Sequence, residues 1–396
     1  SDSSHSSVSG RDVNTADFPY NLGNDADSSE YIFATHNEKN DFVVESKVKY
    51  GLEKYVGYSK LNSENYCLLL RYKAKLVAQG FGHKKLIDYE DTFSHVVKMV
   101  TDRCLLNIVV LNYWPVFQLD VNNAFLYGDL DETVYIKPLE RYFSLGNKVC
   151  RLKKSLYGLK QAPRQWNAKL TSALIENRFS HSKSDYSLYT KSDKNVFLAL
   201  LVYVDDIIIT GNNVVEVDKF KVFLKSKFMI KDLGKFKYFL GIEVIDTDKG
   251  ICLNQIKYVL DLVSDYGMLA CKPAKTPLMS KLVISNEASD NDPILDNIID
   301  YQNLMGKLIY LTNTKPDISY VVHCLSQFIH SSLKSLFKIA FKILRYLKTC
   351  PCLGNHIVKN SGMNLKAFSD AHWAKCVVTR KSVIGYCVFL NGSLVS

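Results

Sequence analysis

The sequence predicts a mixed α/β protein, and two observations carry that prediction. From about Arg71 onward, short apolar runs of strand length alternate with longer amphipathic stretches of helical length. Hydrophobic residues make up 47% of the 396 residues and charged residues 23%, so the chain can bury sizeable cores. A chain of this length is expected to divide into two or three domains.

Three elements are predicted between residues 72 and 121. The segment 72–81 is predicted to be a strand that leads into a glycine turn. The segment 101–113 carries apolar residues at helical spacing and is predicted to be a helix that ends before Pro115. The segment 116–121 alternates apolar and polar residues as a strand does.

A buried hairpin is predicted around two adjacent aspartates. The apolar runs 196–204 and 207–210 flank Asp205 and Asp206, and both runs have the length and composition of buried strands.

The remainder of the chain is predicted to be a strand pair, a helical region and a final strand. The strand pair covers 238–244 and 250–253. The helical region extends from residue 256 to about residue 348, and a last strand begins at Leu365.

Charge is distributed unevenly along the chain. Residues 1–40 hold seven acidic residues, two basic residues and eight serines, which predicts a disordered leader. The whole chain nevertheless has a formal net charge of +10, so the basic excess belongs to the part that follows. Such an excess favours a polyanionic partner, although basic enzymes without nucleic-acid ligands are common.

Cysteine spacing and apolar run length point to an intracellular protein without a membrane partner. None of the ten cysteines lies in a C-x-x-C motif, so we expect reduced thiols rather than disulfides or zinc ligands. The start of the chain lacks the basic and apolar regions of a signal peptide. The longest unbroken apolar run, 196–204, is far shorter than the ~20 residues that cross a bilayer.

Three aspartates stand at the ends of strongly apolar strands. Asp120 lies in FQLDVNNAF, and Asp205 and Asp206 lie in LVYVDDIII. Burying an ionised carboxylate costs free energy unless a cation or a hydrogen-bond donor pairs with it. Three carboxylates could hold two hard divalent cations and leave positions for water and a substrate phosphate. On this evidence alone, an Asp-Asp pair between two strands is more often a simple turn.

Five segments together resemble the copia-type LTR retrotransposon reverse transcriptase. They are FQLDVNNAF, SLYGLKQAPRQW, YVDD, KDLGKFKYFLGIEV and KPDISYVVHCLSQF, and the resemblance extends from about Arg71 to the end of the chain. It implies a right-hand polymerase with fingers, palm and thumb, followed by a helical connection and a partial ribonuclease H-like fold.

The resemblance implies roles for individual residues. Asp120, Asp205 and Asp206 would be the catalytic carboxylates that bind two Mg²⁺ ions, with Mn²⁺ as a substitute, and the carbonyl of Val121 would add a ligand. The residues implied for the incoming nucleotide are Phe125 as the steric gate against a ribose 2′-OH, Gln161, and Lys73 or Lys75. The residues implied for the primer are Tyr203 and, in a primer-grip hairpin, Leu240, Gly241 and Glu243. Outside the ordered set of motifs, each would be interpreted as an ordinary core, loop or hairpin residue.

Two segments offer basic surface for a nucleic acid. Residues 151–170 carry six basic residues and no acidic residue, together with Tyr157 and Trp166, which could neutralise phosphates and stack on bases. A solvated face with two core aromatics is the alternative.

The second segment is a predicted helix ending near residue 348. Its basic residues fall within about 120° of one another on a helix, opposite an apolar face. These residues are Lys334, Lys338, Lys342, Arg345 and Lys348. We expect Lys338, Lys342 and Arg345 to contact the backbone of a duplex, and membrane-surface binding is the competing use.

The sequence departs from the family pattern at its C-terminal part. LKAFSDAHW resembles the opening motif of a ribonuclease H domain and makes Asp370 its first carboxylate. His372 stands where the family usually has a second Asp, and residues 371–396 contain no Asp or Glu. Because two-metal RNA hydrolysis needs several converging carboxylates, we expect no ribonuclease H activity and interpret Asp370 as a relic.

A second departure lies upstream, in the expected fingers. SKLNSENYCLLL runs directly into RYKAKLVAQG, where the family carries a longer segment, as though an internal stretch were deleted. Such a deletion would leave a sheet edge without a partner. His95 also replaces a proline that is common in the family.

Four regions are therefore expected. They are a leader and linker remnant at 1–70, fingers and palm at 71–250, thumb and connection at 251–360, and a truncated ribonuclease H-like domain at 361–396. The expected function is RNA-directed DNA polymerisation, with an RNA template, a DNA primer or RNA–DNA hybrid, and dNTPs as partners. The alternatives are a catalytically dead fragment that binds nucleic acid and a two-metal nuclease. The expected location is cytoplasmic, in a virus-like particle, or nuclear.

Overall fold

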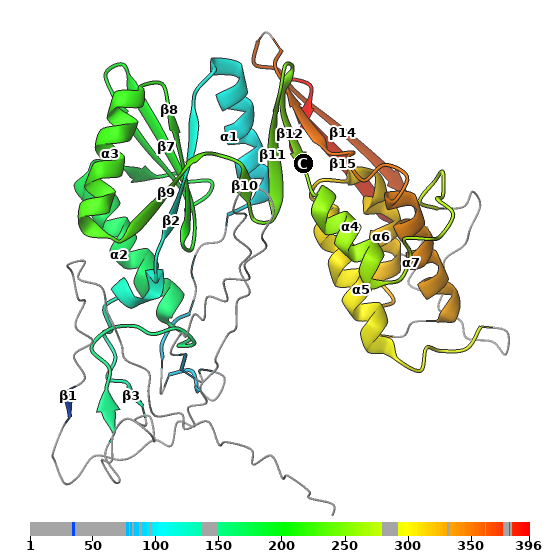
Figure 1. Cartoon of the computed structure of the whole chain (residues 1–396), viewed down its shortest axis with the longest axis horizontal. Helices are drawn as coiled ribbons and strands as arrows, with labels where there is room; N and C mark the ends of the chain where they lie inside the picture. Colours follow the sequence, from blue (N-terminus) through cyan, green and yellow to red (C-terminus); the bar gives the residue numbers. More distant parts are fainter. Residues whose placement is uncertain are drawn as a thin grey trace, which may run out of the picture.

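A computed structural model describes most of the chain from residue 97 onward. The described residues are 34–35, 77–78, 80, 83–86, 89–92, 94, 97–136, 149–278, 292–330, 333–360, 362–374, 380 and 382–396. Most of the predicted leader and linker therefore lies outside them. Figure 1 shows two lobes, one built on a large sheet and one built on helices, with a smaller sheet between them.

The first lobe is built on a six-stranded sheet in which every neighbouring pair is antiparallel. In spatial order the strands are β5 (Ser180–His181), β6 (Leu188–Asp193), β7 (Val196–Tyr203), β8 (Asp206–Gly211), β2 (Val116–Val121) and β9 (Ile230–Lys235). The strands predicted at 116–121 and around Asp205–Asp206 are thus confirmed, and β7 and β8 form the predicted hairpin.

Successive side chains of β2, β7 and β8 point to opposite faces of the sheet, so they contribute to two different cores. One set, which includes Leu119, Leu200 and Ile207, packs against α2 (Ala162–Glu176) and α3 (Val214–Lys227). The other set, which includes Leu201 and Ile208, packs against α1 (Met99–Asn112). Because successive strand residues point to opposite faces, an apolar strand that is covered on both faces needs no polar alternation.

The boundaries of these helices follow from local chemistry. Helix α1 ends at Asn112, the next residue Tyr113 caps it with φ 55°, and Pro115 follows; the predicted helix is confirmed. Helix α2 begins with Pro163 in its first turn. The side chain of Asn213 accepts a hydrogen bond from the amide of Glu216 and caps α3. Our sequence analysis did not predict α2 or α3, although Pro163 and Asn213 are start signals that the sequence contains.

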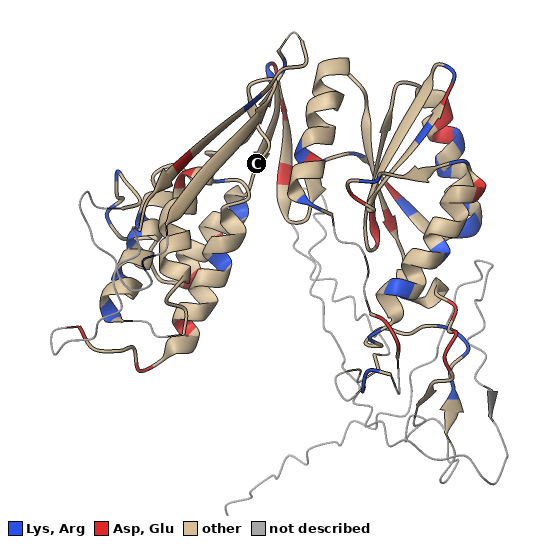
Figure 2. Cartoon of the chain, turned by 180° about the vertical axis from the view of Figure 1, so that it is seen from behind, with Lys and Arg blue, Asp and Glu red and all other residues tan. Residues whose placement is uncertain are grey.

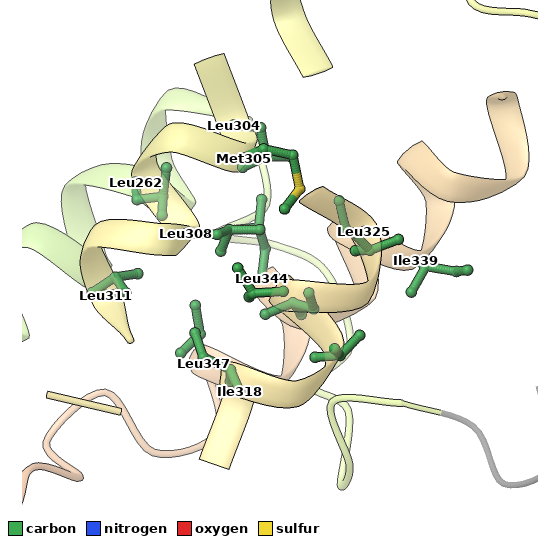
Figure 3. Packing of buried hydrophobic residues seen from close by; sticks show 14 of the residues in the cluster. Leu262, Leu304, Met305, Leu308, Leu311, Ile318, Leu325, Ile339, Leu344 and Leu347 are labelled. Carbon is green, nitrogen blue, oxygen red and sulfur yellow. The ribbon is translucent and has the colours of Figure 1, made fainter. Parts of the chain in front are cut away.

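The second lobe is a bundle of four helices, as predicted for the region after residue 256. The helices are α4 (Ile256–Asp265), α5 (Ile298–Leu311), α6 (Ser319–Ser326) and α7 (Lys334–Leu347), with a 3-10 turn η3 (Pro316–Ile318) before α6. Their apolar faces meet in one core of leucine, isoleucine, valine and methionine side chains, part of which Figure 3 shows. None of the described helices has the length and apolarity that crossing a bilayer requires.

Two further sheets connect the lobes and continue to the C-terminal part. One has the order β10 (Tyr238–Phe239), β11 (Ile242–Thr247), β12 (Gly250–Asn254) and β13 (Asn355–Val358). The other has the order β14 (Leu365–His372), β15 (Val383–Leu390) and β16 (Ser393–Leu394), and β14 is the predicted final strand. The predicted strand 238–244 is divided in the structure, because Leu240 and Gly241 have φ 51° and 71° and turn the chain between β10 and β11.

The remaining described elements are short. They are β1 (Ala34–Thr35), β3 (Tyr135–Ile136) and β4 (Cys150–Arg151), which form a small sheet, and a 3-10 turn η2 (Ala124–Tyr127). Within the predicted strand 72–81, Val77 forms an isolated bridge with Tyr157.

Candidate active site

The fold brings the three aspartates to one end of the large sheet. Asp120 and Asp206 are direct register partners across β2 and β8, so their side chains share a face. Asp205 lies in the turn before β8, and the Val121 amide donates a hydrogen bond of 2.9 Å to its carbonyl. All three are partly exposed. Residues separated by more than eighty positions are thus neighbours because two strands pair in this register.

The turn that carries Asp205 is held by a hydrogen bond from helix α2. Val204 has φ 54°, and its carbonyl accepts a hydrogen bond of 2.7 Å from Nε1 of Trp166. Trp166 is buried, so this aromatic of the basic segment belongs to the core. The tertiary contact fixes a turn that a β-branched residue does not favour by itself.

The carboxylates form an electrostatically unfavourable group. Burial raises the pKa of Asp206, a hydrogen bond from the Gln118 amide opposes that shift, and the charges of Asp205 and Asp120 raise the pKa further. The Gln118 Nε2 to Asp206 Oδ1 distance is 3.3 Å. A bound cation would relieve this repulsion, and carboxylate oxygens are the ligands that hard divalent ions prefer.

The donor chemistry therefore fits Mg²⁺ at Asp120, Asp205 and Asp206. Within the described part of the chain, however, no three or more Asp, Glu, His or Cys side chains form a group that could hold a metal ion. The backbone has assembled the carboxylates, whereas their side chains are not arranged as a three-ligand cluster.

One basic residue near the carboxylates was missed by our sequence analysis. Lys231 on β9 is the register partner of Asp120 on the side opposite to Asp206, and its side chain is exposed. Because β9 lies far from β2 in sequence, only the strand order reveals this neighbour. A cation on this face could contact an anionic substrate or balance part of the carboxylate charge.

The predicted nucleotide residues have different surroundings. Phe125 lies in η2 and packs against Tyr157, with ring centroids 4.8 Å apart. Burial raises the pKa of Tyr157, and the charges of Asp205 and Asp120 raise it further. Gln161 is fully buried at the start of α2 rather than facing solvent. Lys73, Lys75 and His95 lie outside the described residues.

The predicted primer-grip turn is attached to the helical lobe. The Tyr310 hydroxyl on α5 donates a hydrogen bond to the Leu240 carbonyl. A Cβ on Gly241 would meet that hydroxyl oxygen, and the φ of 71° at this position also favours glycine. Tyr203 packs against Phe239 at a centroid distance of 6.4 Å, and Glu243 accepts a hydrogen bond of 2.9 Å from the Tyr238 hydroxyl. Sequence analysis gave no signal for Tyr310.

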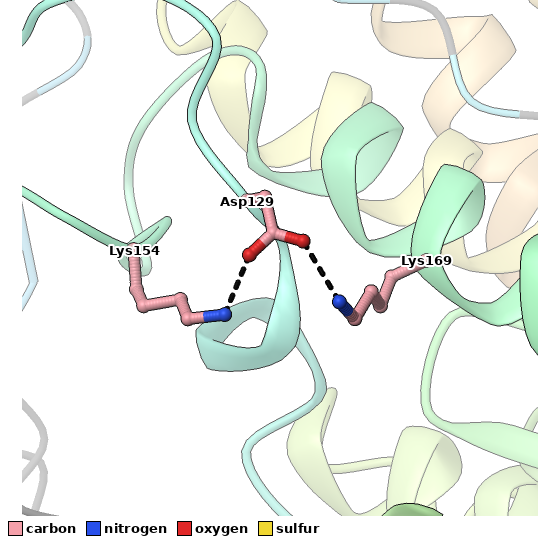
Figure 4. A network of polar contacts seen from close by, with 3 residues as sticks. All are labelled: Asp129, Lys154 and Lys169. Carbon is pink, nitrogen blue, oxygen red and sulfur yellow. Dashed lines mark hydrogen bonds and ion pairs between the residues drawn. The ribbon is translucent and has the colours of Figure 1, made fainter.

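The basic segment 151–170 is partly neutralised by acids from elsewhere in the chain. Asp129 accepts ion pairs from Lys154 at 2.5 Å and Lys169 at 2.8 Å, as Figure 4 shows. The hydrogen bonds from these lysines hold the pKa of Asp129 below its ordinary value. Arg164 pairs with Asp91 at 2.6 Å. Three of the six basic residues are therefore paired with acidic residues that lie outside the segment 151–170.

Helix α7 carries the predicted cationic stripe, but some of its members have structural roles. Arg345 Nε donates to the Lys272 carbonyl at 2.7 Å, and Lys348 Nζ donates to the Cys271 carbonyl at 2.7 Å. Lys338, Lys342 and Arg345 line an open pocket of about 520 Å³ over Met268 and Phe341. The helix lies on the side of the bundle away from the large sheet in Figure 1. Positions coloured as Lys and Arg occur on both lobes in Figure 2, with acidic residues interspersed.

Asp370 is remote from these carboxylates. It lies on β14 in the C-terminal sheet, and its side chain is exposed.

Comparison with known proteins gave consistent matches. Residues 45–280 match a family described as reverse transcriptase (RNA-dependent DNA polymerase). The Retrovirus-related Pol polyprotein from transposon RE1 of Arabidopsis thaliana is 39% identical over 342 residues, which cover 85% of this chain and 23% of that protein. The corresponding polyprotein from transposon TNT 1-94 of Nicotiana tabacum is 37% identical over 350 residues, which cover 85% and 26%.

The chain thus spans about a quarter of the length of these curated relatives. Among solved structures, a foamy viral protease-reverse transcriptase in complex with double-stranded DNA overlaps 81% of this chain and 48% of its own, with a TM-score of 0.45 and 13% identity.

Proposed function

Because the chain belongs to the reverse transcriptase (RNA-dependent DNA polymerase) family, we propose that it extends a primer on an RNA template. Membership of this family, with copia-type Pol polyproteins as relatives, confirms the resemblance stated from the sequence motifs. The proposed substrates are dNTPs and a primer paired with the template.

The register pairing of Asp120 with Asp206, with Asp205 in the adjoining turn, is the observation that carries the proposal. Bound Mg²⁺ ions would neutralise phosphate charge and lower the pKa of the primer 3′-OH. Asp120, Asp205 and Asp206 would hold them, together with the Val121 carbonyl. The raised pKa of Asp206 means that this carboxylate takes up a proton more readily than an ordinary Asp when no cation is bound.

Other residues of the chain would orient the substrates. The ring of Phe125, fixed against Tyr157, supports a role in excluding a ribose 2′-OH. The β10–β11 turn, held by Tyr310, supports a role in placing the primer end. Positioning of this kind supplies much of the rate acceleration in phosphoryl transfer.

The test is primer extension by the purified chain on a homopolymer RNA template with Mg²⁺. Asp205→Asn should lower dNTP incorporation by at least about a hundredfold while the circular dichroism spectrum stays unchanged. The matched control is Asp370→Asn, which removes an exposed carboxylate outside the site and should leave extension unchanged. Equal extension by Asp205→Asn and the parent would refute the assignment.

The second candidate is a protein that binds nucleic acid without polymerising. The observation in its favour is that the described side chains do not form a three-ligand metal cluster. Salt-sensitive binding to an RNA–DNA hybrid, with no Mg²⁺-dependent extension by the parent chain, would support this candidate instead.

A further inference from the structure

A buried arginine on α1 contacts two other parts of the chain. Arg103 is 8% exposed, and its guanidinium donates two hydrogen bonds to main-chain carbonyls. Nη2 donates to the Asn313 carbonyl, just after α5 in the helical lobe, at 2.5 Å. Nη1 donates to the Val395 carbonyl, next to β16, at 3.1 Å. This one side chain therefore joins the first lobe directly to the helical lobe and to the C-terminal sheet.

Helix α1 is itself fixed to the sheet that carries the carboxylates. Its Leu106 shares a buried core with Leu201 of β7 and Ile208 of β8. The Thr101 hydroxyl, near the start of α1, also donates to Oδ2 of Asp185 before β6 at 2.6 Å. Because a close-packed core transmits displacements, α1 cannot shift without disturbing the β7–β8 hairpin.

The carbonyl of Asn313 is anchored within the helical lobe. The buried Thr314 hydroxyl donates to Oε1 of Gln255, the residue before α4, at 2.7 Å. The buried Lys315 ammonium donates to three carbonyls of the turn 350–353 that follows α7, at distances from 2.5 to 3.3 Å. A hydrogen bond to Asn313 therefore holds the helical lobe as a unit rather than α5 alone.

The same end of α5 has a second attachment outside its own lobe. The Tyr310 hydroxyl donates to the Leu240 carbonyl in the β10–β11 turn. Tyr310 and Asn313 are three residues apart, about one helical turn. A single contact would let α5 pivot about it, whereas two contacts to different elements restrain its direction. The direction of α5 and the position of the turn are thus coupled.

An arginine suits this place because of its geometry rather than its contribution to stability. Burial lowers the pKa of Arg103, because a charged guanidinium loses its hydration there. Buried charges contribute little net stability even when they are hydrogen-bonded. The guanidinium, however, is a planar fork whose donors point in fixed directions. It therefore holds its two acceptor carbonyls in a fixed relative position, which the single ammonium of a lysine does not impose.

We propose that Arg103 is a positioning residue that sets the direction of the helical lobe, and with it the β10–β11 turn, relative to Asp120, Asp205 and Asp206. The effect on the primer end rests on the proposed function, whereas the placement of the lobe does not. Without the guanidinium, the Tyr310 bond remains as one of the two attachments, and the lobe can pivot about it. A misplacement of about 1 Å can lower the rate of a positioned reaction by about a hundredfold.

The placement of the lobe is tested by pulsed electron paramagnetic resonance on the full chain. Spin labels on genetically encoded p-acetylphenylalanine replace the exposed Lys219 on α3 and Lys334 on α7, and they report the distance between the lobes. Arg103→Met keeps a long side chain and removes both donors, so it should widen the distance distribution about twofold or more. Arg103→Lys keeps the charge but not the fork, and its distribution should lie between the two.

Tyr301→Phe is the matched control. It removes a buried hydroxyl that donates to the Leu325 carbonyl at 2.9 Å, and both residues lie in the helical lobe. This variant loses a buried hydrogen bond to a carbonyl and should keep the distance distribution of the parent. Circular dichroism checks that each variant is folded. If Arg103→Met does not fold, Arg103→Lys carries the same comparison.

The catalytic consequence is measured by single-turnover primer extension, in which rate and amplitude are determined separately. Arg103→Met should lower the rate at saturating dNTP by about tenfold. The dNTP concentration that gives half this rate should stay within about twofold of the parent's, because Phe125 and Gln161 lie in the first lobe. A loss of stability alone would lower the amplitude, which is the fraction of active molecules, and leave the rate unchanged. Tyr301→Phe should keep the rate of the parent.

A distance distribution like that of the parent in both Arg103 variants would overturn the proposal, whatever their polymerase activity. A wider distribution with an unchanged single-turnover rate would overturn its catalytic part. If the parent chain extends no primer, the proposed function fails, whereas the distance measurement still decides whether Arg103 places the lobes.

Discussion

Two antiparallel strand pairs of this chain, β2–β8 and β14–β15, have similar compositions and different environments. Both are rich in apolar residues and both carry aspartate. Leu119 on β2 is fully buried beneath α2 and α3, and Ile208 on β8 is buried beside α1. Every residue of β14 is exposed. The comparison teaches that an apolar sequence can form a strand in either environment, whereas the burial of that strand depends on helices that its own sequence does not specify.

The difference extends to the carboxylates. Burial raises the pKa of Asp206. The Gln118 hydrogen bond opposes this shift, and the charges of Asp205 and Asp120 add to it. Asp370 stands in water on an uncovered sheet. The same residue type is therefore suited to bind a cation in the first strand pair, and it is a solvent-exposed surface charge in the second.

The largest expected effect is the loss of stability when a leucine is shortened to alanine. We expect this loss in the β2–β8 pair and not in the β14–β15 pair. Leu119→Ala leaves a cavity between β2 and its two helices, and we expect the free energy of unfolding to fall by about 2–5 kcal/mol. Leu365→Ala on β14 is the matched control, with a side chain that is 68% exposed, and should change it by less than about 0.5 kcal/mol. Urea unfolding in dilute solution measures both. Equal losses of stability in the two variants would contradict the contrast between the covered and the exposed strand.

Buried and exposed carboxylates should also differ in their pH dependence. Asp102 on α1 is buried, which raises its pKa from 3.8 to about 7, against the lowering effect of Arg103. Between these two pKa values the folded state holds a proton that the unfolded state has released. The free energy of unfolding therefore falls as the pH rises from 3.8 to about 7.

An asparagine at position 102 cannot ionise, so the Asp102→Asn variant lacks this pH-dependent loss of stability. The stability advantage of Asp102→Asn over the parent should therefore widen by roughly 2–3 kcal/mol between pH 5 and pH 8. Urea unfolding at the two pH values measures the gap, and a constant gap would contradict the burial argument.

The smallest effect is expected at the hairpin that the helical lobe holds. Tyr310→Phe removes the hydroxyl that donates to the Leu240 carbonyl, and protection of the β10–β11 turn should fall by roughly 1 kcal/mol. Tyr346→Phe removes a comparable hydroxyl bond, to Asp317, away from this turn. Hydrogen–deuterium exchange of residues 238–243 should increase in the first variant and not in the second. An unchanged turn in both would show that α5 does not hold it.

Local patterns predicted much of the fold. The strand at Val116–Val121, the hairpin around the aspartates and the helix before Pro115 appear where periodicity and breakers place them. Helices α2 and α3 were not predicted, because polar and charged residues interrupt the apolar spacing of both segments. Pro163 and the Asn213 cap were the local signals that could have identified them.

The sequence by itself determined the family, the apolar strands and the three carboxylates that end them. Tertiary structure decided which distant groups meet: Asp129 with two lysines, Trp166 with the Val204 carbonyl, and Tyr310 with the hairpin turn. It also decided that one apolar sheet is covered and another is open. The physical reason is that periodicity and turn chemistry act over a few residues, whereas ion pairing and burial depend on strand order and helix packing across the whole chain.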